Sequence, residues 1–204
     1  MPRAASANSI DSQIARRVAR RARGTVFTPD SFASLGTRGA IDKALQRLEA
    51  KGTLRRLSRG LYDKPRHDDL LGTLWPTVDA VVKAVAGTNK LRIQPAGVYA
   101  ANMLGLSEQV PARVVLLTDG LSRTVQAGPL KIALKRTTPR QMAAAGRTSG
   151  LLIQAFKSLG AANVTPARIE RLRQTIPAAE RARVLKDIAL APTWMRPALR
   201  QVAS

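Results

Sequence analysis

Between residues 38 and 47, several side chains are of the types that hydrogen-bond to the edges of DNA bases. These residues are Arg38, Gly39, Asp42, Lys43, Gln46 and Arg47. Arginine can bond to guanine, and glutamine to adenine, through two hydrogen bonds at once. A glycine in such a segment has no side chain to hold a helix away from a groove. The segment therefore predicts contact with the major groove of double-stranded DNA.

A second basic group follows in a pattern typical of a β-hairpin. Residues 53–57 and 61–64 are strand-like, the Ser-Arg-Gly sequence at 58–60 predicts a turn, and Pro65 ends the second strand. The exposed cations of this hairpin would be Arg55, Arg56 and Arg59. We expect them to reach an adjacent phosphate or a minor groove.

The elements that must position these residues can be placed from apolar spacing and capping residues. A first helix is expected over residues 9–23, and a short extended stretch over 25–27. Thr28 and Pro29 predict the start of a short second helix to residue 35, and Gly36 ends it. Thr37 caps a third helix that runs to residue 51, and both threonines are included among the expected DNA contacts.

This order of elements predicts a winged helix-turn-helix over residues 1–66. Two helices joined at a glycine-containing turn are typical of a helix-turn-helix, whose second helix enters the major groove. A hairpin directly after that helix is a wing. An ordinary amphipathic helix has the same spacing, so the combination of elements carries the prediction rather than the third helix alone.

The charge of the chain favours a polyanionic partner. Its 204 residues carry 34 lysines and arginines against 13 acids, a formal net charge of +21. Charge of this size is relieved by nucleic acid, which releases counterions on binding. Residues 1–66 hold 15 basic and 5 acidic residues, so this third is the denser in positive charge. A GC-rich coding bias would raise arginine but would not explain the scarcity of acids.

Residues 67–204 predict a mixed second domain, which makes the whole chain α+β. The sequence His67-Asp68-Asp69 is expected to be the linker between the domains. A small antiparallel sheet is expected from strands at 114–117, 122–126 and 130–135, with the second strand pairing back on the first. Helices are expected over 75–86, 97–104, 151–159, 165–175 and 177–189, with a short one from 192. Trp194 is expected in the core rather than at a base-stacking surface.

The sequence offers no residues for catalysis, a cofactor or a metal. It has no cysteine, a single histidine, and neither a GxxxxGK[ST] nor a GxGxxG motif. Its acids are scattered, whereas phosphoryl transfer needs clustered carboxylates for Mg²⁺. We therefore expect a protein that is not an enzyme.

The expected location is the cytoplasm, in association with the nucleoid. No apolar run approaches the length needed to cross a bilayer, and no apolar segment of the signal-peptide type follows the N-terminus. The arginines of residues 16–23 would also suit a transit peptide or a helix on a membrane surface. A first helix of the DNA-binding domain is the favoured interpretation.

Three segments of the chain resemble the AbiEi-type antitoxins of bacterial type IV toxin–antitoxin systems and a set of shorter, uncharacterised relatives. They are residues 54–65, residues 99–120 with the pattern YAANxLGL…QVP…LTDG, and residues 130–140. The resemblance implies a winged helix that represses its own promoter and a C-terminal domain with antitoxin activity. It also implies a nucleotidyltransferase-like toxin that forms no stable complex with the antitoxin. The present chain is shorter than the full antitoxins.

These observations lead to one main functional hypothesis and one alternative. The main hypothesis is a sequence-specific repressor that binds the DNA of its own promoter, as a homodimer where the site is palindromic. The alternative is a non-specific nucleic-acid-binding or RNA-binding protein without antitoxin activity. A steep dependence of affinity on salt, with no preference for promoter DNA, would favour the alternative.

Overall fold

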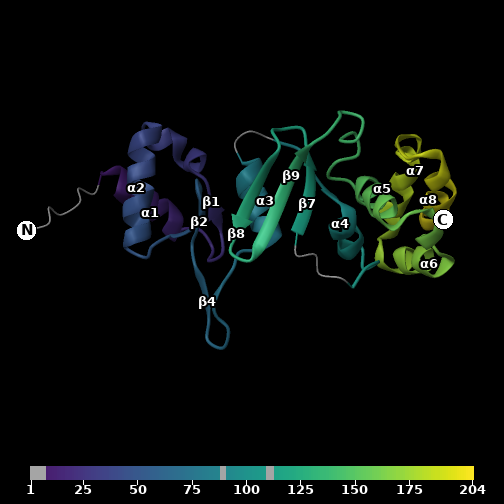
Figure 1. Ribbon diagram of the computed structural model, residues 1–204, viewed down its shortest axis with the longest axis horizontal. Coiled ribbons are helices and arrows are strands. Elements are labelled where there is room, and N and C mark those ends of the chain that lie inside the picture. The colour runs from purple at the N-terminus through teal and green to yellow at the C-terminus, as the bar shows by residue number, and fades with distance from the viewer. Residues whose placement is uncertain (1–7, 88–90, 109–112) are drawn as a thin grey trace, which may run out of the picture. The chain divides into compact units, whose positions relative to one another are not determined.

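The computed structural model describes residues 8–87, 91–108 and 113–204 (Figure 1). The chain divides into two compact units, which we call the N-terminal unit and the C-terminal unit. The N-terminal unit ends before Leu91 and includes the short segment 126–129, and the C-terminal unit comprises the remainder. The expected domain boundary after residue 66 therefore lies inside the N-terminal unit.

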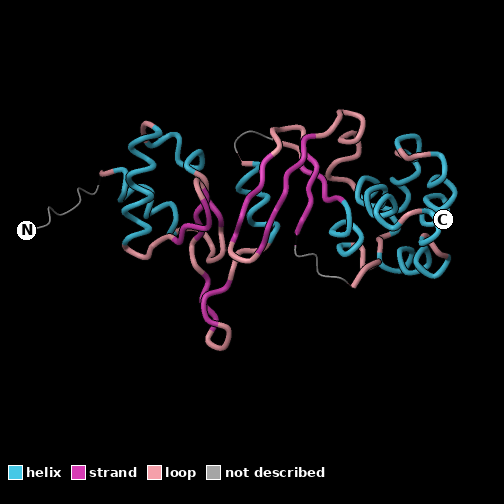
Figure 2. The backbone as a smooth tube through the Cα atoms, viewed as in Figure 1, coloured by secondary structure: helices cyan, strands magenta, loops and turns pink. Residues whose placement is uncertain are grey.

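The prediction of an α+β chain with several helices and small antiparallel sheets is confirmed. Helices and strands occur in both units, and Figure 2 separates them by colour. Within the described ranges, no helix has the length and apolar character needed to span a membrane.

The N-terminal unit alternates short helices with short strands. Its elements are α1 (Ile10–Ala19), β1 (Val26–Phe27), the 3₁₀ helix η1 (Pro29–Leu35), α2 (Arg38–Ala50), β2 (Arg55–Ser58), β3 (Leu61–Asp63), β4 (Arg66–Asp68), β5 (Gly72–Leu74) and α3 (Val78–Ala86). The expected helices and strands of residues 9–64 are all present. The first helix ends at Ala19, earlier than the expected end at residue 23.

Two helices of this unit begin at side-chain caps that the sequence supplies. The backbone N–H of Ser12 donates to Ser9 Oγ at 3.2 Å, and that of Ala40 donates to Thr37 Oγ1 at 3.4 Å. Each bond satisfies one of the N–H groups that lack a partner in the first turn of a helix. The caps therefore fix where α1 and α2 begin.

The apolar faces of α1 and α2 pack against each other and against β1 and η1. The rings of Phe27 and Phe32 are stacked with their centroids 5.6 Å apart. The buried side chains at helical spacing are Ile14, Val18, Ile41, Ala44, Leu45 and Leu48. Because these positions take one face of α2 into the core, its opposite face is left exposed.

Two small antiparallel sheets belong to this unit. In the first, β3 lies between β1 and β2, and Asp63 is opposite both Val26 and Arg55. In the second, β4 pairs with β5, and His67 lies opposite Thr73. The expectation of a linker at residues 67–69 is wrong, because these residues belong to a hydrogen-bonded hairpin.

The C-terminal unit combines a four-stranded sheet with a group of helices. Its elements are β6 (Ile93–Ala96), α4 (Gly97–Met103), β7 (Arg113–Thr118), β8 (Arg123–Ala127), β9 (Leu130–Arg136), α5 (Thr148–Leu159), η2 (Ala161–Asn163), α6 (Pro166–Thr175), α7 (Ala178–Lys186), η3 (Ile188–Leu190), η4 (Thr193–Met195) and α8 (Arg196–Ala203). Every helix expected after residue 97 is present with small shifts of its ends.

The strand order of this sheet is β6-β7-β9-β8, which differs from the expectation. The strand at 122–126 was expected to pair back on 114–117, but β9 lies between them and runs parallel to β7, with Val114 opposite Ile132. Ile132, Ala133 and Leu134 are all buried, so β9 has apolar residues on both faces. A central position in the sheet covers both faces of β9 and so buries more apolar surface than it would for β8, whose residues are mostly exposed.

The helices of the C-terminal unit surround α5. Leu152, Ala155 and Phe156 are fully buried and belong to one core with Leu199 and Val202 of α8. Asp187, also buried, accepts hydrogen bonds from Arg147 Nη1 at 2.7 Å and from the hydroxyl of Ser149. Trp194 was expected in this core but is 45% exposed, and the neighbouring Met195 is buried instead.

Candidate nucleic-acid interface

The residues predicted to contact bases share the exposed side of α2. We call Arg38, Gly39, Asp42, Lys43, Gln46 and Arg47 the α2 outer face. All are exposed except Asp42, which is partly buried. They lie on the side of the helix away from the buried positions Ile41, Ala44, Leu45 and Leu48. The structure thus brings these six predicted site residues onto one surface.

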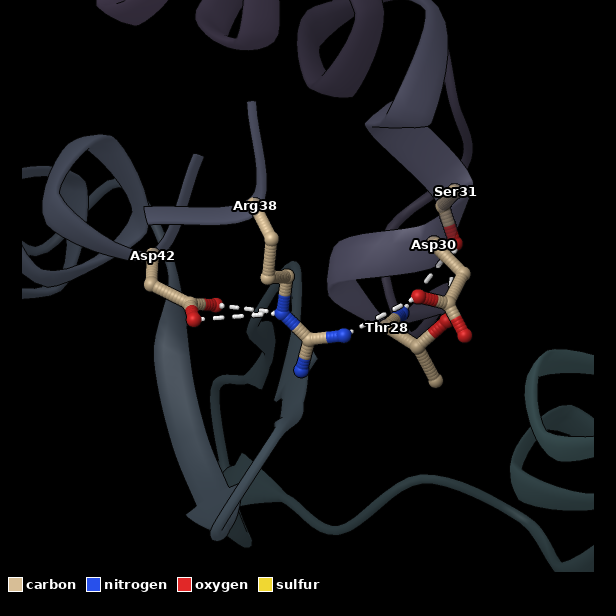
Figure 3. A network of polar contacts seen from close by, with 5 residues as sticks. All are labelled: Thr28, Asp30, Ser31, Arg38 and Asp42. Atoms are coloured by element: carbon tan, nitrogen blue, oxygen red, sulfur yellow. Dashed lines mark hydrogen bonds and ion pairs between the residues drawn. The ribbon is translucent and has the colours of Figure 1, made fainter. Parts of the chain in front are cut away.

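Arg38 is held at the start of α2 by two aspartates (Figure 3). Its Nη1 donates to Asp30 Oδ1 at 3.1 Å, and its Nε lies 3.1 Å from both carboxylate oxygens of Asp42. All three side chains are at least two-fifths exposed. The second terminal nitrogen points away from both carboxylates in Figure 3. The guanidinium is therefore oriented but keeps donors for another acceptor.

The start of η1 beside this network is fixed by its own polar contacts. The backbone N–H of Thr28 donates to Ser31 Oγ at 3.1 Å, and the two hydroxyl oxygens are 3.4 Å apart (Figure 3). Thr28 and Thr37, both predicted site residues, are thus engaged in capping η1 and α2. They lie at the N-termini of the two helices that Arg38 joins through Asp30.

Arg47 is tied to the other helix of the unit. Its Nε and Nη2 donate to the two carboxylate oxygens of Asp11 in α1, both at 2.6 Å. The hydrogen bonds from Arg47 hold the pKa of Asp11 below its ordinary value, and Asp11 in turn raises the pKa of Arg47. The arginine fork is therefore used within the unit, although the side chain is 55% exposed.

Arg55, predicted to reach a phosphate or a minor groove, has its guanidinium committed to the interior of the unit. It donates from Nε at 3.0 Å and from Nη2 at 2.5 Å to the carboxylate of Asp63, which is fully buried. Its Nη2 also donates to the carbonyl of Leu74 at 2.7 Å, and its Cζ lies 4.4 Å from the centre of the Trp75 ring. Arg55 therefore joins β2 and β3 to the end of β5 and to Trp75, which follows it.

The other two arginines of the β2–β3 hairpin are exposed. Arg56 lies opposite Tyr62, whose burial raises the pKa of its phenol. Arg59 is in the turn, next to Gly60, which has a φ of +71° that a residue with a side chain rarely adopts. The hairpin therefore presents two cations, rather than the predicted three, on its outer side.

Sequence analysis did not identify the partners of these arginines or a second basic surface of the unit. A hollow of about 1300 Å³ opens beside α1, β1 and α3. We call it the arginine hollow, after the cations that line it: Arg17, Arg20, Arg21, Arg23, Arg66 and Lys83. The run of arginines at 16–23 indicated positive charge here, but Arg66 and Lys83 are distant in sequence.

Residues 8–87, 91–108 and 113–204 contain no group of three or more histidine, cysteine, aspartate or glutamate side chains that could hold a metal ion. His67 Nδ1 lies 3.1 Å from Thr73 Oγ1 in the β4–β5 hairpin.

Comparison with known proteins gives one family. No curated protein and no solved structure matches the chain. A model of the family described as "Family of unknown function (DUF6088)" matches residues 13–184, which include most of both units. The chain therefore belongs to the DUF6088 family.

Proposed function

We propose that the chain is a sequence-specific DNA-binding protein whose N-terminal unit is a winged helix-turn-helix. The observation that carries the proposal is the order α1-β1-η1-α2-β2-β3 with β3 central in its sheet and one face of α2 exposed. In a helix-turn-helix, the exposed face of the second helix lies in the major groove. Here α2 follows η1 after only Gly36 and Thr37, which suits that role.

The roles of the residues follow from their contacts in the free protein. Arg38, Lys43 and Gln46 would contact base edges, because none of them has its donors fully committed to the protein. Arg56 and Arg59 would lie along the phosphates or in a minor groove beside α2. Thr28 and Thr37 would bring helix N-termini towards phosphate oxygens. Arg47 and Arg55 are assigned to holding the unit together.

Asp42 gives the proposed surface selectivity as well as orientation. It fixes Arg38 Nε and places a carboxylate on the surface that would face DNA. A carboxylate there repels phosphates and accepts from the amino group of cytosine. Its presence favours a sequence-selective contact over one driven by charge alone.

The resemblance to AbiEi-type antitoxins supports a more specific biological role. On that basis the protein would repress its own promoter in the cytoplasm and act as the antitoxin of a type IV toxin–antitoxin system. Its functional partner would be a nucleotidyltransferase-like toxin that it does not bind stably. These proposals rest on the similarity of residues 54–65, 99–120 and 130–140.

The proposal is tested by equilibrium titration of a labelled duplex from the DNA upstream of the gene and of a scrambled duplex of equal length. We expect the upstream duplex to bind about a thousandfold more tightly, as specific sites do. Both affinities should fall as the salt concentration rises, and binding to the scrambled duplex should disappear at a lower salt concentration than binding to the upstream duplex. Equal affinities at every salt concentration would contradict sequence-specific recognition and support the alternative of non-specific nucleic-acid binding.

A further inference from the structure

The β4–β5 hairpin carries two leucines in solvent at its turn. Leu70 is 95% exposed and Leu71 is 75% exposed. Figure 1 shows the hairpin extending away from β1 and β2 of the same unit. We call Asp68, Asp69, Leu70 and Leu71 the leucine tip. Leucines on an ordered tip lose hydrophobic stabilisation unless another surface covers them.

The leucine tip is an ordered turn in which both leucine side chains are exposed. Asp68 Oδ1 accepts hydrogen bonds from the backbone N–H groups of Leu70 and Leu71, both at 3.0 Å. These bonds lower the pKa of Asp68. Gly72 follows with a φ of +70° and closes the turn. Because the turn is already ordered, little conformational entropy remains to be lost when it docks.

The arginine hollow of the same unit is lined by positive charge and apolar surface, which complements the acids and leucines of the tip. Its cations face a single lining acid, Asp79, which already pairs with Lys83 at 2.7 Å. In the described part of the chain, Arg20, Arg21 and Arg66 have no ion-pair partner. Trp75, Ala80 and Ala84 add apolar surface to the lining. The hollow therefore suits an occupant that is apolar and acidic at once.

We propose that the leucine tip of one copy docks into the arginine hollow of a second copy, so that the protein forms a homodimer. Charge complementarity selects this occupant, since the tip places two acids beside two leucines on a chain with a net charge of +21. Arg66 and Leu74, at the base of the hairpin, line the hollow of their own copy. A two-fold axis can therefore let both copies exchange tips, so that each contributes one tip and one hollow. The proposal does not depend on DNA binding.

Sedimentation velocity across micromolar concentrations tests this dimer. We expect the wild-type chain to pass from monomer to dimer, and the double variant Leu70→Ser with Leu71→Ser to raise the dissociation constant about tenfold or more. Both positions are in solvent, so the variant should keep the wild-type circular dichroism. The matched control is Leu121→Ser, because Leu121 is 79% exposed in the C-terminal unit. It should leave dimerisation unchanged.

Charge reversal tests the pairing of tip and hollow. Asp69→Lys and Arg21→Glu should each weaken the dimer, and the chain with both changes should recover much of the wild-type affinity. A monomer at every concentration, or a leucine variant that dimerises like the wild type, would overturn the proposal. It would also fail if Arg21→Glu weakened binding to random duplex DNA while the leucine variant sedimented unchanged, because the hollow would then belong to nucleic acid.

Discussion

The α2 outer face and the β2–β3 hairpin each hold an arginine by aspartate carboxylates, but the two ion pairs differ greatly in burial. Arg38 is held by Asp30 and Asp42 in solvent, whereas Arg55 is held by a fully buried Asp63. A solvated ion pair contributes little to stability, and removal of one partner of a buried pair is costly. Burial, rather than residue type, therefore distinguishes the two arginines: Arg55 is committed to the fold, whereas Arg38 keeps donors exposed to solvent.

Among the substitutions considered, Asp63→Asn should change stability the most. It tests the buried ion pair between Arg55 and Asp63. The substitution leaves the guanidinium of Arg55, which is 21% exposed, without its carboxylate. We expect the free energy of unfolding to fall by about 3 kcal/mol, measured by urea denaturation. A loss as small as that of an exposed pair would mean that Arg55 is not structural and is available for DNA after all.

Arg38→Ala tests the exposed arginine of this comparison through the affinity for specific DNA. Specific binding should weaken by about 1–3 kcal/mol, as expected for loss of a two-bond contact to a base, with the stability nearly unchanged. Arg59→Ala is the matched control on the hairpin. It should weaken binding to the upstream and scrambled duplexes alike and reduce the salt slope by about one. If both variants lost the same affinity for both duplexes, the assignment of Arg38 to bases and Arg59 to phosphates would be contradicted.

Asp42→Asn sharpens the interpretation of the α2 outer face. Removal of this carboxylate releases Arg38 Nε and reduces repulsion of phosphates, so affinity for the scrambled duplex should rise by about threefold. Preference for the upstream duplex should fall at the same time. Fluorescence anisotropy measures both quantities. Unchanged affinity for both duplexes would place Asp42 outside the interface.

Asp11→Asn should have the smallest effect, since its partner Arg47 is half exposed. The pKa of Asp11 in the folded chain lies below its ordinary value of 3.8 because Arg47 donates to the carboxylate. The resulting stability is present above that ordinary value and is lost as the pH falls through the folded pKa. Thermal unfolding should show this acid-dependent loss in the wild type. A variant that loses as much stability as the wild type over the same pH range would show that the pair contributes nothing.

Most elements with a large apolar buried face were predictable from the sequence, but β6 was missed because its buried side chains, Gln94 and Ala96, are polar and small. The stripe of Ile41, Ala44, Leu45 and Leu48 gave α2, and Thr37 gave its start. The β4–β5 hairpin was missed because its strands bury no side chain, so apolar spacing carries no signal there. The order β7-β9-β8 was missed because pairing between distant strands is decided by burial in the assembled sheet.

The sequence predicted which side chains lie on the exposed surface, but only some of their ion-pair partners could be inferred from it. Asp42 follows Arg38 at the i,i+4 spacing of helix ion pairs, so this contact could have been found. Arg55 and Asp63 become partners once the hairpin register is known. Asp30, Asp11 and Arg66 reach their places through tertiary packing, which spacing along the chain does not reveal.

DNA binding through the α2 outer face and the β2–β3 hairpin is tested most directly by mapping the DNA-bound surface with nuclear magnetic resonance. Amide and arginine side-chain signals of the full chain would be followed as the upstream duplex is added. We expect the largest shifts at residues 28–47 and at Arg56 and Arg59, with little change at Arg55. Shifts concentrated in residues 113–136 or 166–186, with the α2 outer face unaffected, would contradict this mode of binding.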